Sequence, residues 1–233
     1  MNRDLYWPEC YNARDLGGLP TLDGKITIRR SLIRSDVLNR LTEEGKQRLI
    51  EYGVKTIVDL RYPHEFDSNP AVSFFDNKEN HNPEYYNVPL GRDDPEIWET
   101  INRFEDPSSY YGFWLDSFPD AVCQIMRIIL GSKPGGVVFH CHAGKDRTGM
   151  IAALLLGLAG VSRDLIIADY TYTNVRLRPF FETNPMRGHW ATEKRIASML
   201  DYIESYVGGA EEYLEFSGLG KEELTILRNR LVL

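Results

Sequence analysis

The chain has 233 residues, of which 42% are hydrophobic, 12% aromatic and 26% charged. This is the composition of an ordinary globular protein, and it excludes a disordered chain, a collagen-like chain and a coiled coil. The formal net charge of −7 argues against a general nucleic-acid or membrane-surface binder, although a local positive pocket can still hold an anionic substrate.

Three cysteines, Cys10, Cys123 and Cys141, are too few and too scattered for a disulfide framework, so we expect a reducing compartment. The N-terminal segment lacks the apolar stretch that a signal peptide requires. The longest apolar run, residues 150–159, is too short to cross a bilayer. We therefore expect a cytoplasmic protein without stable membrane insertion, although export without a signal peptide would leave no trace in such a sequence.

The first third of the chain alternates between predicted strands and helix. Residues 25–34 alternate partly between apolar and polar side chains, which is typical of a strand or a hairpin edge. Residues 42–52 predict a short helix, with Thr42 as its N-cap and acidic residues in its first turn. The β-branched, apolar residues 54–60 predict a buried strand.

The middle of the chain continues the same alternation. Residues 67–84 are rich in Asn, Asp and Pro and predict an exposed loop, and residues 85–90 predict a second strand. Residues 113–130 carry apolar side chains at helical spacing. A third buried strand is predicted at residues 137–140, and a helix at residues 148–158.

The last part of the chain predicts helices only. One begins after Ser162, which can act as its cap, and two more fit residues 192–207 and 221–231. No internal repeat or interdomain linker is visible. Strands that alternate with helices predict an α/β fold, with a central mostly parallel sheet flanked by helices.

The segment VVFHCHAGKDRTGM carries the chemistry. A buried strand ends at His140, Cys141 follows, and a helix begins near Thr148. In open α/β sheets ligands bind outside the carboxyl ends of the strands, and a loop there directs backbone N–H groups and the positive helix end at an anion. Gly144 lets the backbone approach a ligand closely, and Arg147 offers a planar fork for two phosphate oxygens. The same positive field stabilises a thiolate at Cys141, so a nucleophile and an anion cradle share one loop.

Three other interpretations of this segment are weaker. A nucleotide-binding P-loop fails, because Phe139 stands at its first glycine position and Asp146 follows Lys145. A metal site built from consecutive His140, Cys141 and His142 is disfavoured, since three neighbours seldom converge on one ion. An inert buried cysteine would be the simplest interpretation of a lone thiol, but the glycine, lysine, arginine and threonine that follow it argue against that.

The decapeptide HCHAGKDRTG resembles the HCxxGxxRT signature of cysteine-dependent protein tyrosine phosphatases, and in particular a bacterial group with the loop HCxxGKDRTG. Further segments resemble that group: NARDLGG at 12–18, IVDLRYPHEF at 57–66, AALLL at 152–156, DYTYTN at 169–174 and YLEFSGLGKEEL at 213–224. The resemblance implies one phosphatase domain over residues 1–233 that hydrolyses phosphate monoesters through a phosphocysteine. Because the residues indicate no metal site, we expect no cofactor and no metal. Lipid phosphatases have the similar loop HCxxGKxR, so phosphoinositides join phosphotyrosine and phosphoserine or phosphothreonine as expected substrates.

The loop residues take distinct expected roles. Cys141 is the nucleophile, and Arg147 with the N–H groups of residues 142–147 holds the phosphoryl oxygens. The residues expected to bind substrate are His142, Ala143, Gly144, Lys145 and Thr148. Thr148 either donates a hydrogen bond to the thiolate or only starts the helix, and Lys145 either adds charge at the mouth or is a solvated lysine. The resemblance implies that His140 orders the loop and is not the general base.

The proton donor for the leaving oxygen is less clearly marked. Asp146 lies inside the phosphate loop and is the preferred candidate, since a positioned carboxyl contributes about 10²–10⁴-fold. Asp59 ends a buried strand and should also face the site, unless it is a structural partner of an arginine. Asp93 and Asp94 follow another strand in a charged loop, which is where a mobile acid would lie, although a solvated loop is the commoner explanation.

Segments outside the loop are expected to support it. Arg14 and Asp15 should tie the N-terminal segment to the site or its wall, and Asp169, Tyr170 and Asn174 lie at helical spacing behind the loop. The aromatic side chains between residues 96 and 118 either cover the site or pack as an ordinary helix.

Two other functions remain open at this point. A sulfurtransferase or an arsenate reductase also uses a cysteine-started anion loop, and an inactive module could bind phosphate without turnover. The six-residue step from Cys141 to Arg147 and the Arg-Thr pair favour a phosphatase. The expected partner is a phosphorylated protein or a phosphoinositide, with no nucleic acid.

Overall fold

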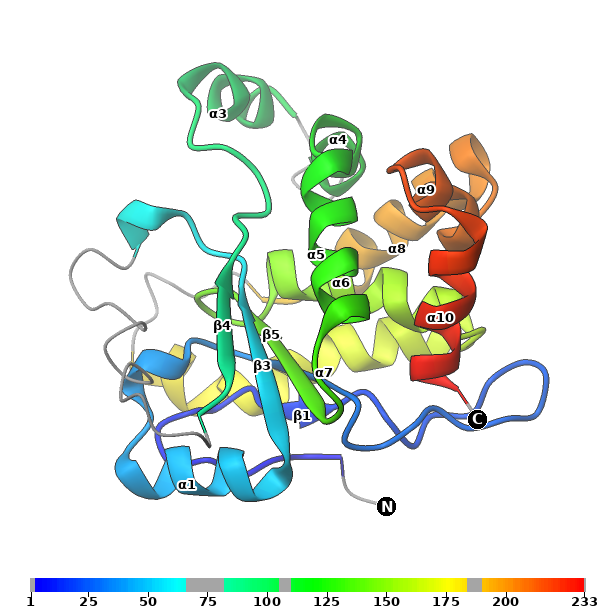
Figure 1. Ribbon diagram of the computed structural model, residues 1–233. Helices are drawn as coiled ribbons and strands as arrows, with labels where there is room; N and C mark the ends of the chain where they lie inside the picture. Colours follow the sequence, from blue (N-terminus) through cyan, green and yellow to red (C-terminus); the bar gives the residue numbers. More distant parts are fainter. Residues whose placement is uncertain (1–2, 66–81, 105–109, 184–189, 233) are drawn as a thin grey trace.

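A five-stranded sheet forms the centre of the protein. The structure, a computed structural model, describes residues 3–65, 82–104, 110–183 and 190–232. Its strands are β1 (Arg14–Asp15), β2 (Leu32–Ser35), β3 (Val54–Asp59), β4 (Glu84–Asn87) and β5 (Gly136–His140). Their order is β1-β2-β5-β3-β4, with β1 antiparallel to β2 and every other pair parallel (Figure 1). The expected α/β fold with a mostly parallel sheet is therefore confirmed.

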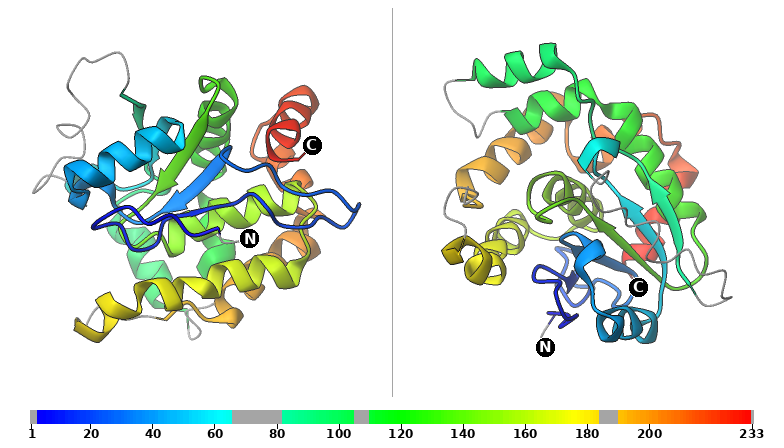
Figure 2. Two further views of the ribbon diagram at one scale, coloured as in Figure 1. Left: turned by 90° about the horizontal axis from the view of Figure 1, so that it is seen from below. Right: turned by 90° about the vertical axis from the view of Figure 1, so that its left-hand side faces the viewer.

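Helices flank this sheet on both faces (Figures 1 and 2). The helices are α1 (Glu43–Tyr52), α3 (Pro95–Asn102), α4 (Tyr110–Ser117), α5 (Pro119–Gly131), α6 (Asp146–Leu158), α7 (Arg163–Thr183), α8 (Glu193–Tyr202), α9 (Ala210–Phe216) and α10 (Lys221–Leu231). Short turns of helix form η1 (Leu38–Arg40), η2 (Pro63–Glu65) and the π-helical η4 (Ile203–Val207).

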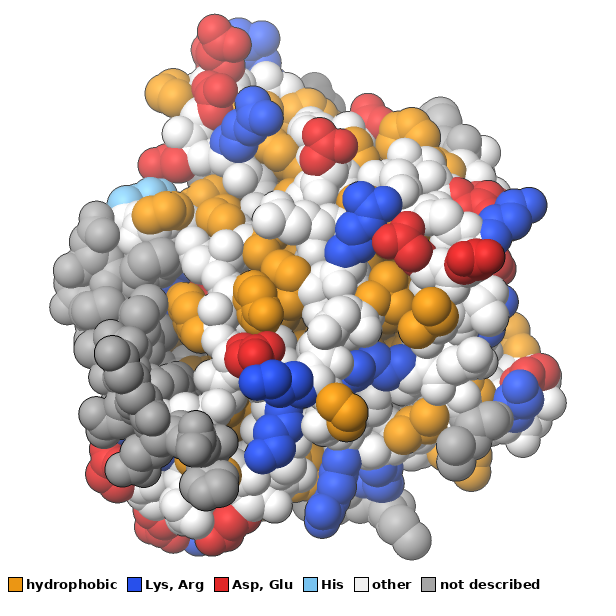
Figure 3. All heavy atoms as spheres, viewed as in Figure 1, with side chains coloured by type: hydrophobic (Ala, Val, Ile, Leu, Met, Phe, Trp, Pro, Cys, Tyr) orange, Lys and Arg blue, Asp and Glu red, His pale blue; other side chains and the backbone are white. Residues whose placement is uncertain are grey.

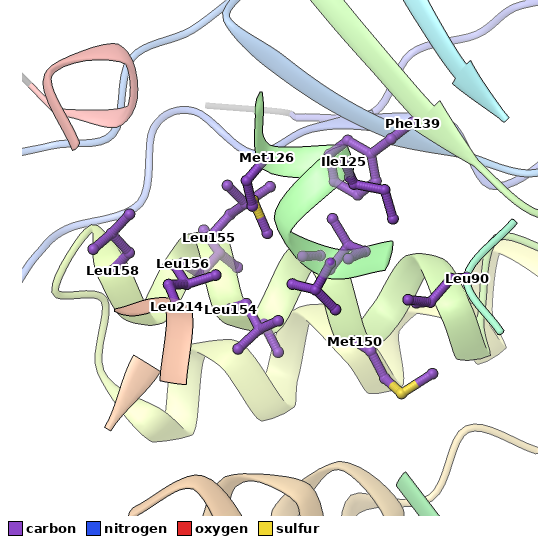
Figure 4. Close-up of a cluster of buried hydrophobic side chains, with 14 of the residues drawn as sticks. Leu90, Ile125, Met126, Phe139, Met150, Leu154, Leu155, Leu156, Leu158 and Leu214 are labelled. Carbon is purple, nitrogen blue, oxygen red and sulfur yellow. The ribbon is translucent and has the colours of Figure 1, made fainter. Parts of the chain in front are cut away.

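The alternation of side chains along the strands builds two cores. Ile33, Ile57 and Val138 face a smaller core beneath α1, whereas their neighbours Val58 and Phe139 face a larger one. The larger core surrounds α6, whose apolar side chains are buried along its length between the sheet and the other helices (Figure 4). The N-terminus of this enclosed helix meets the carboxyl end of β5, the middle strand.

Several predicted elements differ from the structure. The strand predicted at residues 85–90 is β4, which ends at Asn87. The helix predicted at residues 113–130 is two helices, because Phe118 has a non-helical backbone (φ −134°, ψ 44°) and Pro119 starts α5. The strand predicted at residues 25–34 is confined to β2, since the chain turns at Arg30, which has a φ of 60°. The last turn of the helix predicted at residues 192–207 is π-helical.

Other elements agree with the prediction or extend it. Thr42 caps α1 by accepting a hydrogen bond from the N–H of Gly45, and α10 occupies residues 221–231 as predicted. The short helices α3 and α9 were not predicted. Most of the predicted loop at residues 67–84 lies outside the described residues, and β4 begins at its end.

The surface has a mixed character. Acidic and basic side chains are interspersed over the face seen in Figure 3. Among the described residues, no helix has both the length and the apolar character needed to cross a membrane.

All three cysteines are buried, and none of them forms a disulfide.

A buried carboxylate ties three distant segments together. Asp169 of α7 accepts hydrogen bonds from Arg34 of β2 (2.6 Å), Arg14 of β1 (3.1 Å) and Arg3 (2.8 Å). Arg14 and Arg34 are almost completely buried. Burial alone would raise the pKa of Asp169, but the three arginines hold that pKa far below its usual range. The carboxylate is therefore the compensating charge for buried guanidinium groups.

We expect Asp169→Asn to destabilise the protein by about 3–5 kcal/mol, because it leaves buried arginines without a counter-charge. Urea unfolding measures this, and Asp201→Asn, in an exposed pair with Arg163, is the control that should change little. The folded-state pKa of Asp169 is depressed, so its stabilisation is present above the unfolded value of about 3.9 and is lost as the pH falls. The variant should therefore lose less stability on acidification than the parent, and equal losses for Asp169→Asn and Asp201→Asn would contradict this account.

Candidate active site

The predicted catalytic loop lies at the carboxyl edge of the parallel strands. Cys141 directly follows β5, and Asp146 opens α6, so the loop joins the middle strand to the central helix. The Cys141 side chain is 3% exposed. The cysteine thus lies almost fully buried in the loop that leads from β5 to the positive end of a helix.

The carbonyl groups of the loop are bound from behind. The N–H of Val37 donates to the His142 carbonyl oxygen (3.0 Å), and Asn12 Nδ2 donates to the carbonyl oxygens of Ala143 and Gly144 (both 3.0 Å). Because C=O and N–H point in opposite directions across a trans peptide, the N–H groups of residues 143–145 point to the other side of the loop. The first N–H groups of α6 have no partners within the helix and extend this set.

Asn12 is itself fixed by two neighbours. Arg14 Nη1 donates to Asn12 Oδ1 (2.6 Å), and the Asn12 N–H donates to the buried carboxylate of Asp36 (2.8 Å). These contacts orient the amide so that its NH₂ group faces the loop. The chain of contacts from Asp169 through Arg14 to Asn12 therefore ends on the loop carbonyls.

Gly144 packs against β2 too closely for any other residue. Its φ is 65°, and an added Cβ would lie 2.3 Å from the Ser35 carbonyl oxygen. Arg34 Nη2 donates to the Gly144 carbonyl oxygen (2.8 Å). The glycine thus lets the loop sit directly on the neighbouring strand.

Arg147 is held by a residue that the sequence analysis did not single out. Its Nη1 donates to Glu65 Oε2 (2.5 Å) and the Leu60 carbonyl oxygen (3.2 Å), and its Nη2 donates to Glu65 Oε1 (2.7 Å). These bonds use three of the five guanidinium N–H groups. Among the described residues, no bond is formed by Nε or by the second N–H of Nη2, and this edge can bind two phosphate oxygens side by side.

Electrostatics reinforce that arrangement. Burial alone would lower the pKa of Arg147, but the hydrogen bonds to Glu65 and the charge of that carboxylate raise it above its usual value. Burial likewise opposes ionisation of Glu65, whereas its bonds to Arg147 keep its pKa below the usual range. Glu65 lies in η2 within IVDLRYPHEF, and its position after a buried strand was the signal that could have identified it.

The four candidate proton donors occupy different surroundings. Asp146 lines the pocket above the loop, is 34% exposed and accepts a hydrogen bond from Tyr111 (2.5 Å). Asp94 caps α3 through the N–H of Glu96, and Asp93 is exposed beside His64. Of the four, only Asp146 lines this pocket.

Asp59 is placed next to the loop but is fully engaged. Its buried carboxylate accepts hydrogen bonds from Arg61 (2.6 Å) and Tyr85 (2.8 Å), and lies 3.7 Å from His140 Nε2. Burial alone would raise the pKa of Asp59, but His140 and Arg61 lower it. The structure therefore shows the arginine partnership that the sequence left open for this residue.

Three other loop residues can now be placed. His140 is buried, its Nδ1 lies 3.1 Å from the Cys141 carbonyl oxygen, and burial lowers its pKa. Lys145 is 6% exposed, so it is not a solvated lysine. Thr148 Oγ1 is buried and makes no hydrogen bond to any described residue, Cys141 included.

The expected supporting residues divide into two groups. Arg14 and Asp169 support the loop through Asn12 and Arg34, as described above. Asp15 instead accepts hydrogen bonds from the N–H groups of Gly17 and Arg30 (both 2.7 Å), and so fastens the N-terminal segment away from the loop. Asn174 forms two hydrogen bonds with the backbone of Ala191.

A pocket of about 530 Å³ opens above the loop. Its lining residues are Tyr62, His64, Glu65, Ile101, Tyr110, Trp114, Lys145, Asp146, Arg147, Met150 and Arg195. Its lining combines aromatic side chains with the cations Lys145, Arg147 and Arg195. Arg195, from α8, was not predicted. The described residues contain no cluster of His, Cys, Asp and Glu that could hold a metal.

We expect Glu65→Gln to lower kcat/KM by about 10–100-fold, because one charge-assisted bond to Arg147 is lost and its free edge is no longer held in place. Steady-state kinetics on an aryl phosphate measures this. Glu223→Gln is the matched control, since Glu223 also binds an arginine, Arg127, through both oxygens, far along the chain from this pocket. Unchanged kinetics for Glu65→Gln would contradict the proposal that Glu65 holds the Arg147 guanidinium in place.

Known proteins share this sequence pattern over most of the chain. A family model described as the tyrosine phosphatase family matches residues 5–233. The chain is 29% identical over 221 residues to a tyrosine-protein phosphatase of Nostoc commune, covering 86% of this chain and 74% of that protein. It is 26% identical over 196 residues to the triple specificity protein phosphatase PtpB of Mycobacterium tuberculosis, covering 72% of this chain and 68% of that protein.

Among solved structures, P. aeruginosa TpbA matches with a TM-score of 0.41 and 14% identity, covering 75% of this chain and 89% of that one. The family model, in contrast, spans nearly the whole sequence. The chain that carries this cysteine loop therefore belongs to the tyrosine phosphatase family.

Proposed function

We propose that this phosphatase hydrolyses phosphate monoesters through a phosphocysteine at Cys141, with Asp146 as the proton donor. The observation that carries the proposal is the fixed orientation of the peptide groups in the loop that follows Cys141. Its carbonyls are bound from behind, and its N–H groups point to the other side. Among the described residues, the Nε edge of Arg147 forms no bond and can therefore take up phosphate oxygens. Such an arrangement stabilises the negative charge of a phosphoryl group in the transition state.

The proposed reaction has two steps. The Cys141 thiolate attacks phosphorus, an S–P bond forms, and the ester P–O bond breaks as Asp146 gives its proton to the leaving oxygen. Water then attacks the same phosphorus and passes a proton to Asp146, while the S–P bond breaks. The products are the alcohol or phenol and inorganic phosphate, and the thiolate and the acid are restored.

The proposed substrates are phosphorylated proteins, and the finer assignment includes phosphotyrosine, phosphoserine or phosphothreonine, and phosphoinositides. Tyr62, Tyr110 and Trp114 line the pocket and suit an aromatic ring. Lys145 and Arg195 suit additional negative charge near the phosphate. A relative named as a triple specificity protein phosphatase supports more than one substrate class.

We further propose that residues 1–233 act as one catalytic domain in the cytoplasm. The family match over residues 5–233 supports a single domain. Three buried, unpaired cysteines suit a reducing compartment.

We expect Cys141→Ser to reduce turnover of an aryl phosphate by about 10³-fold or more, because a hydroxyl is a far weaker nucleophile at neutral pH. Phosphate binding by the variant should persist, since the loop N–H groups remain. The parent enzyme is compared on a phosphotyrosine peptide, a phosphoserine peptide, phosphoinositide vesicles and thiosulfate with cyanide. Release of phosphate supports the proposal, whereas thiocyanate formation without phosphate release, or an active serine variant, would overturn it.

We expect Asp146→Asn to slow esters with poor leaving groups by about 10²–10⁴-fold and to affect good leaving groups far less. A phenolate of low basicity departs without a proton, whereas an alkoxide does not. Relative kcat/KM over a series of substituted phenyl and alkyl phosphates gives the comparison. Asp59→Asn and a double Asp93/Asp94 variant are measured in parallel, and the assignment is wrong if leaving-group sensitivity appears there instead.

A further inference from the structure

The side chain of Asp146 is held by groups from three helices outside its own. Tyr111 of α4 donates to its Oδ1 (2.5 Å), and Arg195 Nη1 of α8 lies 3.5 Å from the same oxygen. The hydroxyl of Tyr170, from α7, lies 2.8 Å from that of Tyr111. Lys145 Nζ lies 3.5 Å from the other oxygen, Oδ2.

Counting protons fixes the direction of this chain. A tyrosine hydroxyl has one proton to donate, and Tyr111 gives its proton to Asp146. Tyr170 must therefore be the donor in the contact between the two hydroxyls. A chain of this kind, Tyr170 to Tyr111 to Asp146, strengthens each of its hydrogen bonds.

The two oxygens of Asp146 thus have different surroundings. Oδ1 accepts a hydrogen bond from Tyr111 and lies near the Arg195 guanidinium. Both groups direct a proton at Oδ1, so this oxygen acts as an acceptor. Among the described residues, the group near Oδ2 is the Lys145 ammonium, 3.5 Å away, and the short hydrogen bond from Tyr111 goes to Oδ1 and leaves Oδ2 able to carry a proton. A proton on Asp146 therefore belongs on Oδ2.

We propose that Tyr111 is a positioning residue that holds Asp146 through Oδ1 and so directs the proton on Oδ2 at the leaving oxygen. This inference rests on the proposed function, in which Asp146 is the proton donor. Tyr170 and Arg195 are the groups that in turn hold Tyr111.

The packing supports a fixed rather than a chance contact. Tyr111 is 0% exposed and Tyr170 is 1% exposed. The ring of Tyr170 leaves no space for a side chain at position 149, because an added Cβ on Gly149 would lie 2.8 Å from it. The Arg195 guanidinium lies over the rings of Tyr110 and Tyr111, 5.7 Å and 6.0 Å from their centres.

The surroundings of Tyr111 keep it in its donating form. Burial and the nearby negative charge of Asp146 raise the pKa of Tyr111 well above its usual value. The other titratable groups around the carboxyl are Tyr110 on α4, Tyr170 on α7, Arg195 on α8, and Lys145 and Arg147 beside it. Glu65 and His64, from η2, line the same pocket.

The test compares Tyr111→Phe with Tyr213→Phe. Tyr213 of α9 is also fully buried, and its hydroxyl donates a 2.8 Å hydrogen bond to the carbonyl oxygen of Leu115 in α4. This control therefore removes a buried tyrosine hydrogen bond that ends on the helix of Tyr111, without touching Asp146. Tyr111→Phe should lower kcat on alkyl phosphates by about tenfold or more and spare activated aryl phosphates. Its alkaline limb in the pH–rate profile should move to higher pH, because a donor to the carboxylate is lost. Tyr213→Phe should change neither.

Tyr170→Phe provides a gentler variant, since it leaves the bond from Tyr111 to Asp146 in place. We expect the same changes with smaller size. A uniform loss on all substrates with an unmoved alkaline limb, for Tyr111→Phe and for Tyr170→Phe, would overturn the positioning role.

The Asp146→Asn background separates this inference from the proposed function. If Tyr111 acts through Asp146, Tyr111→Phe should add little to the loss already caused by Asp146→Asn. A full additional loss in that background would overturn the positioning role and leave the donor assignment intact. If neither Asp146→Asn nor Tyr111→Phe slows esters with poor leaving groups more than esters with good ones, the donor assignment is overturned, and the inference with it.

Discussion

The hydrogen bonds that hold the loop carbonyls from behind are the interaction on which the rest of the site depends. The peptide groups of a loop can turn either their C=O or their N–H groups toward a ligand. Asn12, Arg34 and the N–H of Val37 bind the carbonyls of residues 142–144, and this leaves the N–H groups to face the pocket. Without these donors, nothing would fix the backbone N–H groups of the loop on the side opposite to its carbonyl groups.

Holding the carbonyls requires polar side chains in the interior, and these need partners of their own. Arg34 reaches the loop and Asp169 at once, and Arg14 orients Asn12 while it also binds Asp169. An unpaired buried charge would be strongly destabilising, so each arginine is matched to the carboxylate. The site is thus built by three segments that are far apart in sequence: the N-terminal segment, β2 and α7.

The part of this site that is local in sequence was predictable. The strand, the cysteine, the glycine and the arginine lie within one segment, and their spacing alone indicates a nucleophile beside an anion nest. The proton donor, Asp146, lies in the same segment and remains a prediction. The pairing of Asp59 with an arginine was also predictable, because Arg61 follows Asp59 by two residues at the end of β3.

The rest depends on contacts across long stretches of chain. Glu65 reaches Arg147 over 82 residues, and Tyr111 reaches Asp146 over 35. For Tyr111 no local pattern separates it from an ordinary core side chain, and for Glu65 the local signal is limited to its position after the buried strand β3. The fold shows the same limit, since Phe118 and Pro119 divide a stretch whose apolar spacing is continuous, and Arg30 turns the chain inside an alternating segment.

A crystal structure of Cys141→Ser soaked with vanadate or phosphate tests the central claim most directly. The account predicts that the equatorial oxygens accept hydrogen bonds from the backbone N–H groups of residues 142–147 and from Nε and Nη2 of Arg147. The loop carbonyls should still be bound to Asn12 and Arg34, and Glu65 should still hold the opposite edge of the guanidinium. An anion bound elsewhere in the pocket, or a loop whose carbonyls have turned toward it, would contradict the account.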